Sequence, residues 1–235
     1  FNFMATRKKS SAKADETLVD IVEVKEQAED FFERYRFVIL GAVGALVLAV
    51  GGFFAYTNFY KIPKQQEAVE QMYQAQIQFE RDSFTQALTN PGGGYQGFLD
   101  ISENYKGTDA ANLALYYAGI SYLNLGQYDA AIDYLKSYKP AGDVIPAMKF
   151  GALGDAYSEK NDFGQAMSYY KKAASTGVNE AITPYYLKKI GMLHERNSEW
   201  DQAIKVYQEI KDKYPTSPDG RDIDKYLIRA EAKKG

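Results

Sequence analysis

The chain has 235 residues with 28 basic and 31 acidic side chains, which gives a formal net charge of -3. This balance lacks the dense cationic surface that binding to nucleic acid requires. The absence of cysteine excludes disulfides, thiolate metal ligands and a cysteine nucleophile, and the single histidine, His194, provides almost no material for histidine-based metal sites or Ser-His-Asp chemistry. We therefore expect a protein that is not an enzyme, with no catalytic residue, metal or cofactor.

The N-terminal 36 residues precede the most apolar segment and divide into two parts. Residues 1–3 lie before Met4, which resembles a natural start, and we leave them out of the fold interpretation. Residues 1–16 are mainly small, polar and basic, and we expect a disordered cytoplasmic arm that touches anionic lipid headgroups. Residues 17–36 place apolar side chains among acidic ones at helical spacing. They predict an amphipathic helix at the membrane interface, with a docking helix for a cytosolic partner as the alternative.

The stretch RYRFVILGAVGALVLAVGGFFAYTNFYK, from Arg34 to Lys61, predicts a transmembrane helix. No charged residue lies between Phe37 and Ala55, and at 1.5 Å per residue this run reaches about 28 Å, close to the hydrocarbon thickness of a bilayer. Aromatic and basic residues flank the run, as is typical of residues at a membrane interface. Because the exit GGFFAYTNFY is too bulky for a signal-peptide cleavage site, we expect residues 37–60 to remain as an uncleaved signal anchor.

Basic residues and small residues predict the orientation and the contacts of this helix. Seven lysines and arginines precede the apolar run, whereas only Lys61 and Lys64 lie close after it. The positive-inside rule therefore places the N-terminus in the cytoplasm and, in a bacterium, the remaining chain in the periplasm. Within the run, a strip of small residues predicts contact with another membrane helix, although glycine and alanine are also common in membrane helices generally. The strip consists of Gly41, Gly44, Ala45 and Ala49.

Three segments after the apolar run align with one another. They are LALYYAGISYLNLGQYDAAIDYLKSY from Leu113, MKFGALGDAYSEKNDFGQAMSYYKKA from Met148 and YYLKKIGMLHERNSEWDQAIKVYQEI from Tyr185. Each contains a glycine, then a turn, an aromatic residue and an alanine. We expect the glycine and the alanine where the two helices of a hairpin cross, and the aromatic residue between neighbouring hairpins. The three sets are Gly119, Tyr128 and Ala131, then Gly154, Phe163 and Ala166, then Gly191, Trp200 and Ala203.

These residues resemble the tetratricopeptide repeat family, whose hairpins of about 34 residues stack into a superhelix. The resemblance implies an all-α fold, with a single N-terminal transmembrane helix followed by a tetratricopeptide-repeat α-solenoid. His194 takes the position of Tyr122 and Tyr157, so we expect it to pack in the core rather than bind a ligand. We expect a repeat domain over 61–218, with a degenerate repeat over 64–108 and repeats over 112–140, 147–174 and 184–214, and a C-terminal capping helix over 219–235.

The first helices of such hairpins line a concave groove, and the geometry of the family implies which side chains face it. The mixture of apolar, aromatic and charged residues suits an extended or helical peptide from a protein partner. For the apolar members, packing against the preceding repeat is the alternative. The expected groove residues are Tyr116, Ile120, Leu123, Asn124, Asp155, Glu159, Tyr185, Lys188, Met192 and Arg196.

The order of a basic arm, a signal anchor and a repeat array resembles the YfgM-like family of bacterial inner-membrane proteins. The resemblance implies a single-pass inner-membrane protein with a periplasmic repeat domain, acting as an ancillary subunit of the Sec translocon. Its implied partners are channel subunits of the translocon, a periplasmic chaperone or an emerging secretory chain, and membrane lipid, with no nucleic acid and no small-molecule substrate. The alternative is a scaffold subunit of another cell-envelope assembly or secretion complex.

Overall fold

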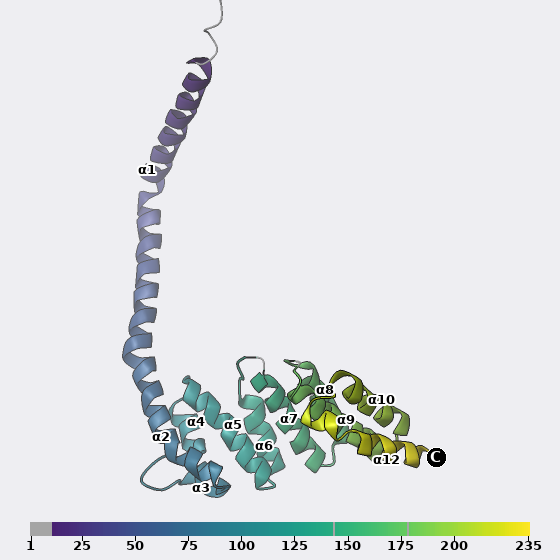
Figure 1. The fold of residues 1–235 in the computed structure, drawn as a ribbon. Coiled ribbons are helices and arrows are strands. Elements are labelled where there is room, and N and C mark those ends of the chain that lie inside the picture. Colours follow the sequence, from purple (N-terminus) through teal and green to yellow (C-terminus); the bar gives the residue numbers. More distant parts are fainter. Residues whose placement is uncertain (1–10, 143, 178) are drawn as a thin grey trace, which may run out of the picture. The chain divides into compact units, whose positions relative to one another are not determined.

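The computed structural model describes residues 11–142, 144–177 and 179–235, and for residues 11–24, 26 and 27 it describes the backbone alone. Within these ranges the chain folds into helices and connecting turns, and no strand is present. The chain divides into two units, Phe1–Tyr60 and Lys61–Gly235. Figure 1 shows the course of the helices.

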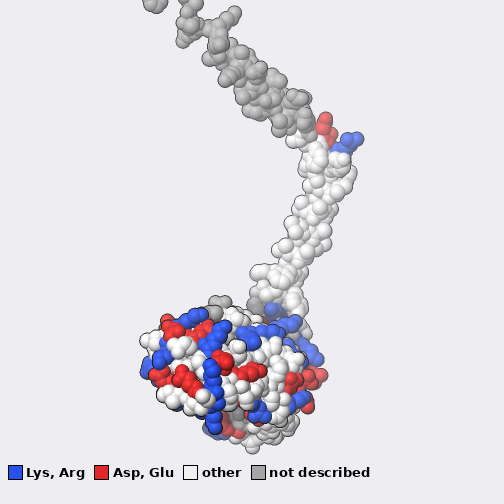
Figure 2. Space-filling model, turned by 90° about the vertical axis from the view of Figure 1, so that its right-hand side faces the viewer, with Lys and Arg blue, Asp and Glu red and all other residues white. Residues whose placement is uncertain are grey.

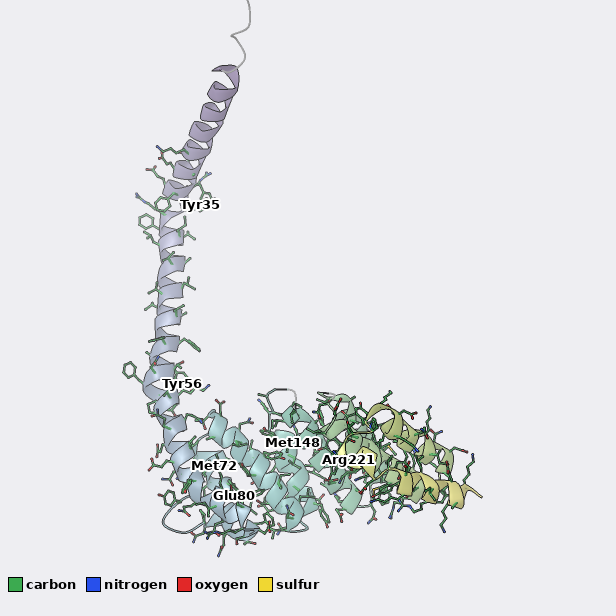
Figure 3. All side chains as sticks on the ribbon, viewed as in Figure 1. Tyr35, Tyr56, Met72, Glu80, Met148 and Arg221 are labelled. Carbon is green, nitrogen blue, oxygen red and sulfur yellow. The ribbon has the colours of Figure 1, made fainter. Side chains whose placement is uncertain are left out.

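The described part of the first unit is mainly one helix, α1 (Ser11–Tyr56), whose large apolar side chains from Phe31 to Tyr56 are mostly exposed. Leu48 is 78% exposed and Phe53 is 72% exposed, so no described part of the chain covers this surface. Figure 2 shows the apolar stretch of α1 without acidic or basic side chains, and Figure 3 shows Tyr35 and Tyr56 at its two ends. Among the described residues, this is the one helix that is long and apolar enough to cross a membrane.

The beginning of α1 differs from the sequence expectation. The helix already includes residues 11–16, which we expected to be disordered, whereas residues 1–10 lie outside the described residues. This segment contains alanine, lysine and acidic residues, which have good or moderate helix propensity, and it extends an existing helix without a new nucleation step. No break in the helix marks the expected boundary between residues 17–36 and residues 37–60.

A short π-helix, η1 (Thr57–Lys61), follows α1 and ends the expected transmembrane segment irregularly. A π-turn displaces backbone carbonyls from their regular pairing, and two side chains bond to such carbonyls here. The Thr57 hydroxyl donates to the Phe53 carbonyl at 2.8 Å, and the Asn58 amide donates to the Phe54 carbonyl at 2.8 Å. The rings of Tyr56 and Tyr60 stack beside them at 5.4 Å between centroids.

The second unit begins with α2 (Ile62–Glu80), α3 (Phe84–Thr89) and α4 (Phe98–Asn104). A two-helix hairpin in the expected degenerate repeat would need one continuous first helix through residues 64–88, but the chain turns at Asp82, which has a φ of 57°. Aspartate tolerates this left-handed conformation better than most residues, and the turn lets α3 fold back against α2 and bury Ala87 and Leu88. The expected degenerate repeat thus contains three helices in place of two.

Three regular hairpins and a C-terminal segment follow, and Figure 1 shows the hairpins stacked in chain order. Helix α12 packs against α10 and covers the end of the stack. The helices are α5 (Asp109–Asn124), α6 (Tyr128–Ser137), α7 (Val144–Glu159), α8 (Phe163–Ser175), α9 (Ile182–Arg196), α10 (Trp200–Lys213), α11 (Pro218–Arg221) and α12 (Asp224–Lys234).

The glycine of each repeat lies where the two helices of its hairpin approach most closely. A Cβ atom placed on Gly154 would lie 2.5 Å from the Tyr170 ring, and one on Gly191 would lie 2.2 Å from the Tyr207 ring. A Cβ atom on Gly119 would lie 2.6 Å from the Leu135 side chain. The alanines Ala131, Ala166 and Ala203 are completely buried at the facing positions. The aromatic residues after the turns, Tyr128, Phe163 and Trp200, are only half-buried.

Ion pairs join each regular hairpin to the element that follows it. In a stacked array every repeat contacts only its neighbours, so such pairs contribute to fixing the angle between consecutive hairpins. They include pairs from α6 to the turn after α7, from α7 to α9, and from α9 to the C-terminal helices. The pairs are Asp129 with Lys160, Asp155 with Lys189, Lys188 with Asp219, and Glu195 with Arg229.

Candidate functional site

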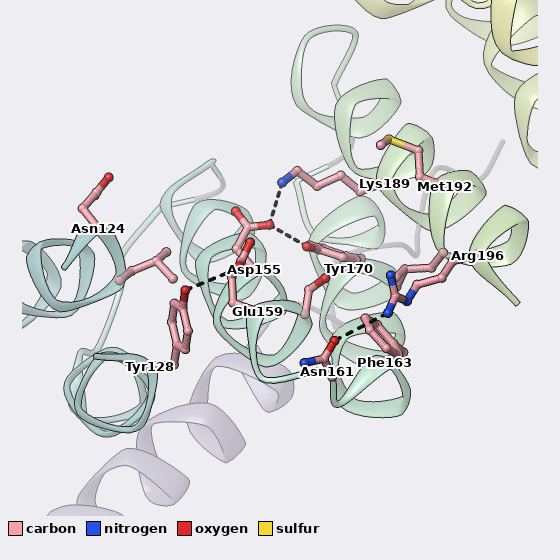
Figure 4. Close-up of a pocket in the computed structure, with 13 residues that line it drawn as sticks. Asn124, Tyr128, Asp155, Glu159, Asn161, Phe163, Tyr170, Lys189, Met192 and Arg196 are labelled. Carbon is pink, nitrogen blue, oxygen red and sulfur yellow. Dashed lines mark hydrogen bonds and ion pairs between the residues drawn. The ribbon is translucent and has the colours of Figure 1, made fainter. Parts of the chain in front are cut away.

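A hollow of about 960 Å³ lies on α5, α7 and α9, and we call it the inner groove. These are the first helices of the three regular hairpins, and we call them the inner helices and their partners α6, α8 and α10 the outer helices. The turn after α7 and the helices α6 and α8 also contribute to the walls of the inner groove, as Figure 4 shows. The inner groove is wide open and largely polar, unlike the enclosed apolar pockets that hold most small ligands. It is lined by Leu123, Asn124, Tyr128, Asp155, Ser158, Glu159, Asn161, Phe163, Tyr170, Lys189, Met192, Leu193 and Arg196.

The structure brings six of the ten expected groove residues together in this hollow, and they come from three consecutive inner helices. Asp155 lies at the centre, where it contacts α8 and α9 (Figure 4). The side chains of Glu159 and Arg196 lie at the C-terminal ends of α7 and α9. The six residues are Leu123, Asn124, Asp155, Glu159, Met192 and Arg196.

The other four expected residues lie outside the inner groove. Tyr116 is half-buried and packs against the Tyr138 ring at 5.2 Å between centroids, and Ile120 packs into the core between α6 and α7. Lys188 points to the C-terminal segment, where it forms an ion pair with Asp219. Tyr185 is 40% exposed near the start of α9.

Asp155 connects three helices at the base of the inner groove. Its Oδ1 atom accepts a hydrogen bond from the Tyr170 hydroxyl at 2.5 Å and from Lys189 Nζ at 2.6 Å. Burial raises the pKa of Tyr170, and the Asp155 carboxylate raises it further. Burial alone lowers the pKa of Lys189, but the charge and hydrogen bond of Asp155 outweigh this effect, so the pKa is raised. At neutral pH, Lys189 is therefore an ammonium and Tyr170 a neutral phenol.

Glu159 and Arg196 are the two charged residues of the inner groove that form no ion pair with another described residue. Glu159 accepts one long hydrogen bond from the Tyr128 hydroxyl, at 3.4 Å. The Arg196 guanidinium donates a weak hydrogen bond to Asn161 at 3.5 Å and stacks on the Phe163 ring at 4.0 Å. Neither side chain has an ion-pair partner within the described part of the chain. Both charges are exposed and available to a binding partner.

Our sequence interpretation missed the contributions of the second helices and the turns. Phe163 and Tyr128 were recognised as aromatic residues after a turn, but we assigned them only to packing between hairpins. Tyr170 follows Gly154 by the same interval by which Tyr207 follows Gly191, which indicates a ring packed on a glycine, and its hydroxyl reaches the inner groove. The missed lining residues are Tyr128, Phe163 and Tyr170 on the second helices, Asn161 in a turn, and Lys189 and Leu193 on α9.

The remaining candidate residues lie outside the inner groove. The strip of Gly41, Gly44, Ala45 and Ala49 is exposed on α1, and a Cβ atom on either glycine would contact nothing within 4 Å. The His194 side chain is 14% exposed, and its Nδ1 atom lies 2.5 Å from Glu199 Oε2. Among the described residues, no group of three His, Cys, Asp or Glu side chains is arranged to hold a metal ion.

Sequence models of the tetratricopeptide repeat match residues 113–139, 150–181 and 189–217. These segments cover the three regular hairpins described above. The chain therefore contains tetratricopeptide repeats, and the expected fold class, an all-α chain with one long apolar N-terminal helix and a repeat solenoid, is confirmed. Such repeats are associated with protein–protein interaction. No curated protein matches the chain, so the resemblance to the YfgM-like family stays a prediction.

Proposed function

We propose that this chain of tetratricopeptide repeats is an ancillary subunit of the Sec translocon, anchored in a bacterial inner membrane with its repeats in the periplasm. The observation that carries the proposal is the combination of an exposed apolar helix and an open, charged groove in one chain. A helix of this length suits a permanent anchor, and a groove of this kind suits a segment of a protein partner.

The small-residue strip of α1 supports contact with a channel subunit. A Cβ atom on Gly41 or Gly44 would contact none of the described residues within 4 Å, so the described structure gives no internal reason for a glycine at either position. Small residues permit close approach of helices in a membrane, where packing rather than hydrophobicity drives association. The strip would therefore place the anchor beside a transmembrane helix of the channel.

The chemistry of the inner groove supports binding rather than catalysis. The carboxylate at its base, Asp155, is already occupied by Tyr170 and Lys189, so it is poorly placed to exchange protons with a substrate. The pKa values of Tyr170 and Lys189 are raised, whereas a catalytic tyrosine or lysine base requires a lowered pKa. A chaperone segment or an emerging secretory chain is the partner that we propose for this surface.

Photocrosslinking in intact membranes tests both contacts. One probe replaces Ala45 in the strip, and a second replaces Met192, which lines the inner groove and is 45% exposed. Val43, on the opposite face of α1, and Lys205, on the outer helix α10, serve as matched control positions. The proposal predicts channel subunits crosslinked at Ala45 and a chaperone or secretory chain crosslinked at Met192, with neither at the controls. Adducts with a different envelope complex at both probes would overturn it and favour the scaffold alternative.

A further inference from the structure

We infer that the groove side of the repeats recognises an amphipathic helix of the partner, with a basic and an acidic side chain seven residues apart beside its apolar face. This inference rests on the proposed function, because it names the kind of segment that a protein partner would insert.

Apolar side chains are exposed at matching positions of neighbouring inner helices. Met148 on α7 and Tyr185 on α9 occupy the same position in consecutive repeats and are 39% and 40% exposed. Met192, two turns after Tyr185, is 45% exposed. We call these three residues the apolar floor. Asp155, the acidic residue at the position equivalent to Met192, is compensated by Lys189 and Tyr170, so the floor carries little net charge.

A row of polar residues follows at the C-terminal ends of the same helices. Asn124, Glu159 and Arg196 stand eleven residues after Leu113, Met148 and Tyr185, at equivalent positions of the three repeats, and we call this row the charged rim. It contains one neutral, one negative and one positive side chain. A partner that lies across the inner helices would therefore contact the apolar floor and the charged rim at the same time.

The spacing of the charged rim favours a helix over an extended strand. Helix α7 contacts both α5 and α9, and packed helices lie about 8–10 Å apart. Residues i and i+7 of an α-helix point the same way about 10.5 Å apart, which is close to the upper end of this interval. Same-face residues of a strand repeat at about 6.7 Å, which does not match it. A helix can thus keep one charged side chain on Glu159 and a second on Arg196.

Charge complementarity then fixes the chemistry of the two side chains. A lysine or arginine opposite Glu159 and an aspartate or glutamate opposite Arg196 would each form an ion pair that the chain itself does not supply. A phosphate-rich partner such as nucleic acid or an anionic lipid surface would be attracted by Arg196 and repelled by Glu159. The rim therefore favours a peptide of mixed charge.

Fluorescence anisotropy with labelled helical peptides tests this inference on the full chain in lipid nanodiscs. The probe is an 18-residue amphipathic helix of leucine, alanine and glutamine, with arginine and glutamate at positions i and i+7 beside the apolar face. A comparison peptide of the same composition carries the charges at i and i+11, which point the same way at a different axial distance. We expect the i+7 peptide to bind about fivefold more tightly, as two partly exposed ion pairs allow.

A variant that reverses one rim charge provides the second arm. Glu159→Arg should lose its preference for the mixed peptide and prefer a peptide with two glutamates at i and i+7. Glu209→Arg makes the same charge change on the outer helix α10, away from the groove, and should alter neither preference.

Equal affinity for the i+7 and i+11 peptides would overturn the inference. A change of preference from the mixed peptide to the peptide with two glutamates in Glu209→Arg would also overturn it. Partner crosslinks at Met192 would then still support the proposed function. The absence of such crosslinks, with the spacing preference intact, would count against the function alone.

Discussion

The glycines of α1 and the glycines of the repeats have opposite surroundings. A Cβ atom on Gly41 or Gly44 would meet nothing within 4 Å, whereas one on Gly154 or Gly191 would collide with a tyrosine ring. Within the repeats, a glycine is required by contacts inside the chain. Within α1 the chain imposes no such requirement, so the surface of this helix is available to lipid or to another protein. Glycine is therefore required by internal packing in the repeats, whereas no contact among the described residues requires it in α1.

Raising the pH should unfold the repeat unit while α1 remains helical in a bilayer, and this is the largest effect that we expect. Burial raises the pKa of Tyr170, Tyr186 and Tyr207 above the usual value of 10.0. The unfolded chain therefore loses these protons at a lower pH than the folded chain, so stability is complete below pH 10 and falls as the pH rises above it. Each unit of pKa difference corresponds to about 1.4 kcal/mol.

Circular dichroism of the full chain in nanodiscs between pH 8 and pH 12 measures this transition. A partial loss of helix signal, with the remainder matching a chain truncated after Tyr60, is the expected result. Retention of the full helix signal at pH 12 would contradict this prediction.

The substitution Gly191→Ala should destabilise the repeat unit by crowding a buried ring. The new Cβ atom would lie 2.2 Å from the ring of Tyr207, which is completely buried and cannot move aside. Overpacking costs about 1–3 kcal/mol, and the better helix propensity of alanine restores up to about 1, so we expect a net loss of about 2 kcal/mol. Thermal unfolding measures the loss, and Gly44→Ala is the matched control. Equal melting temperatures for the two variants would contradict the comparison.

Two tyrosines at equivalent positions of consecutive repeats separate ring packing from hydrogen bonding. Tyr170 donates to Asp155 at 2.5 Å, whereas the buried Tyr207 hydroxyl lies beside the Glu195–Arg229 ion pair and forms no hydrogen bond of normal geometry with the described residues. Tyr170→Phe should cost about 1.5 kcal/mol, because it removes a bond to a charged group, and Tyr207→Phe should change stability by less than about 0.5 kcal/mol. Urea unfolding with an unchanged slope measures both. A larger loss for Tyr207→Phe would contradict this assignment.

The features predicted correctly from the sequence are those that repeat along it. The positions of Gly119, Gly154 and Gly191 recur with their partner alanines. Such a periodic pattern indicates packing, because the two helices of every hairpin cross in the same way. The apolar run of α1 was equally visible, since a helix surrounded by lipid needs no pattern beyond length and absence of charge.

The features that the sequence did not predict depend on the local direction of one side chain. Lys188 and Lys189 are adjacent, but neighbouring residues on a helix point about 100° apart. As a result, Lys188 pairs with Asp219, and Lys189 reaches Asp155. The turn at Asp82 was missed because neither glycine nor proline marks it, although Asp82 and Ser83 are weaker helix formers than the residues before them.

The smallest expected effect concerns a position at which two repeats differ by one oxygen atom. Ser121 on α5 is completely buried, and its hydroxyl has no hydrogen-bond partner among the described residues, whereas the equivalent residue of the next repeat is the buried Ala156. Ser121→Ala removes an unsatisfied polar group and improves helix propensity, so we expect a gain of about 1 kcal/mol in the free energy of unfolding. The converse change, Ala156→Ser, should cost a similar amount. If Ser121→Ala instead lowered the melting temperature, the hydroxyl would have to be bonded within the folded repeat, and the two repeats would differ in their polar contacts rather than only in composition.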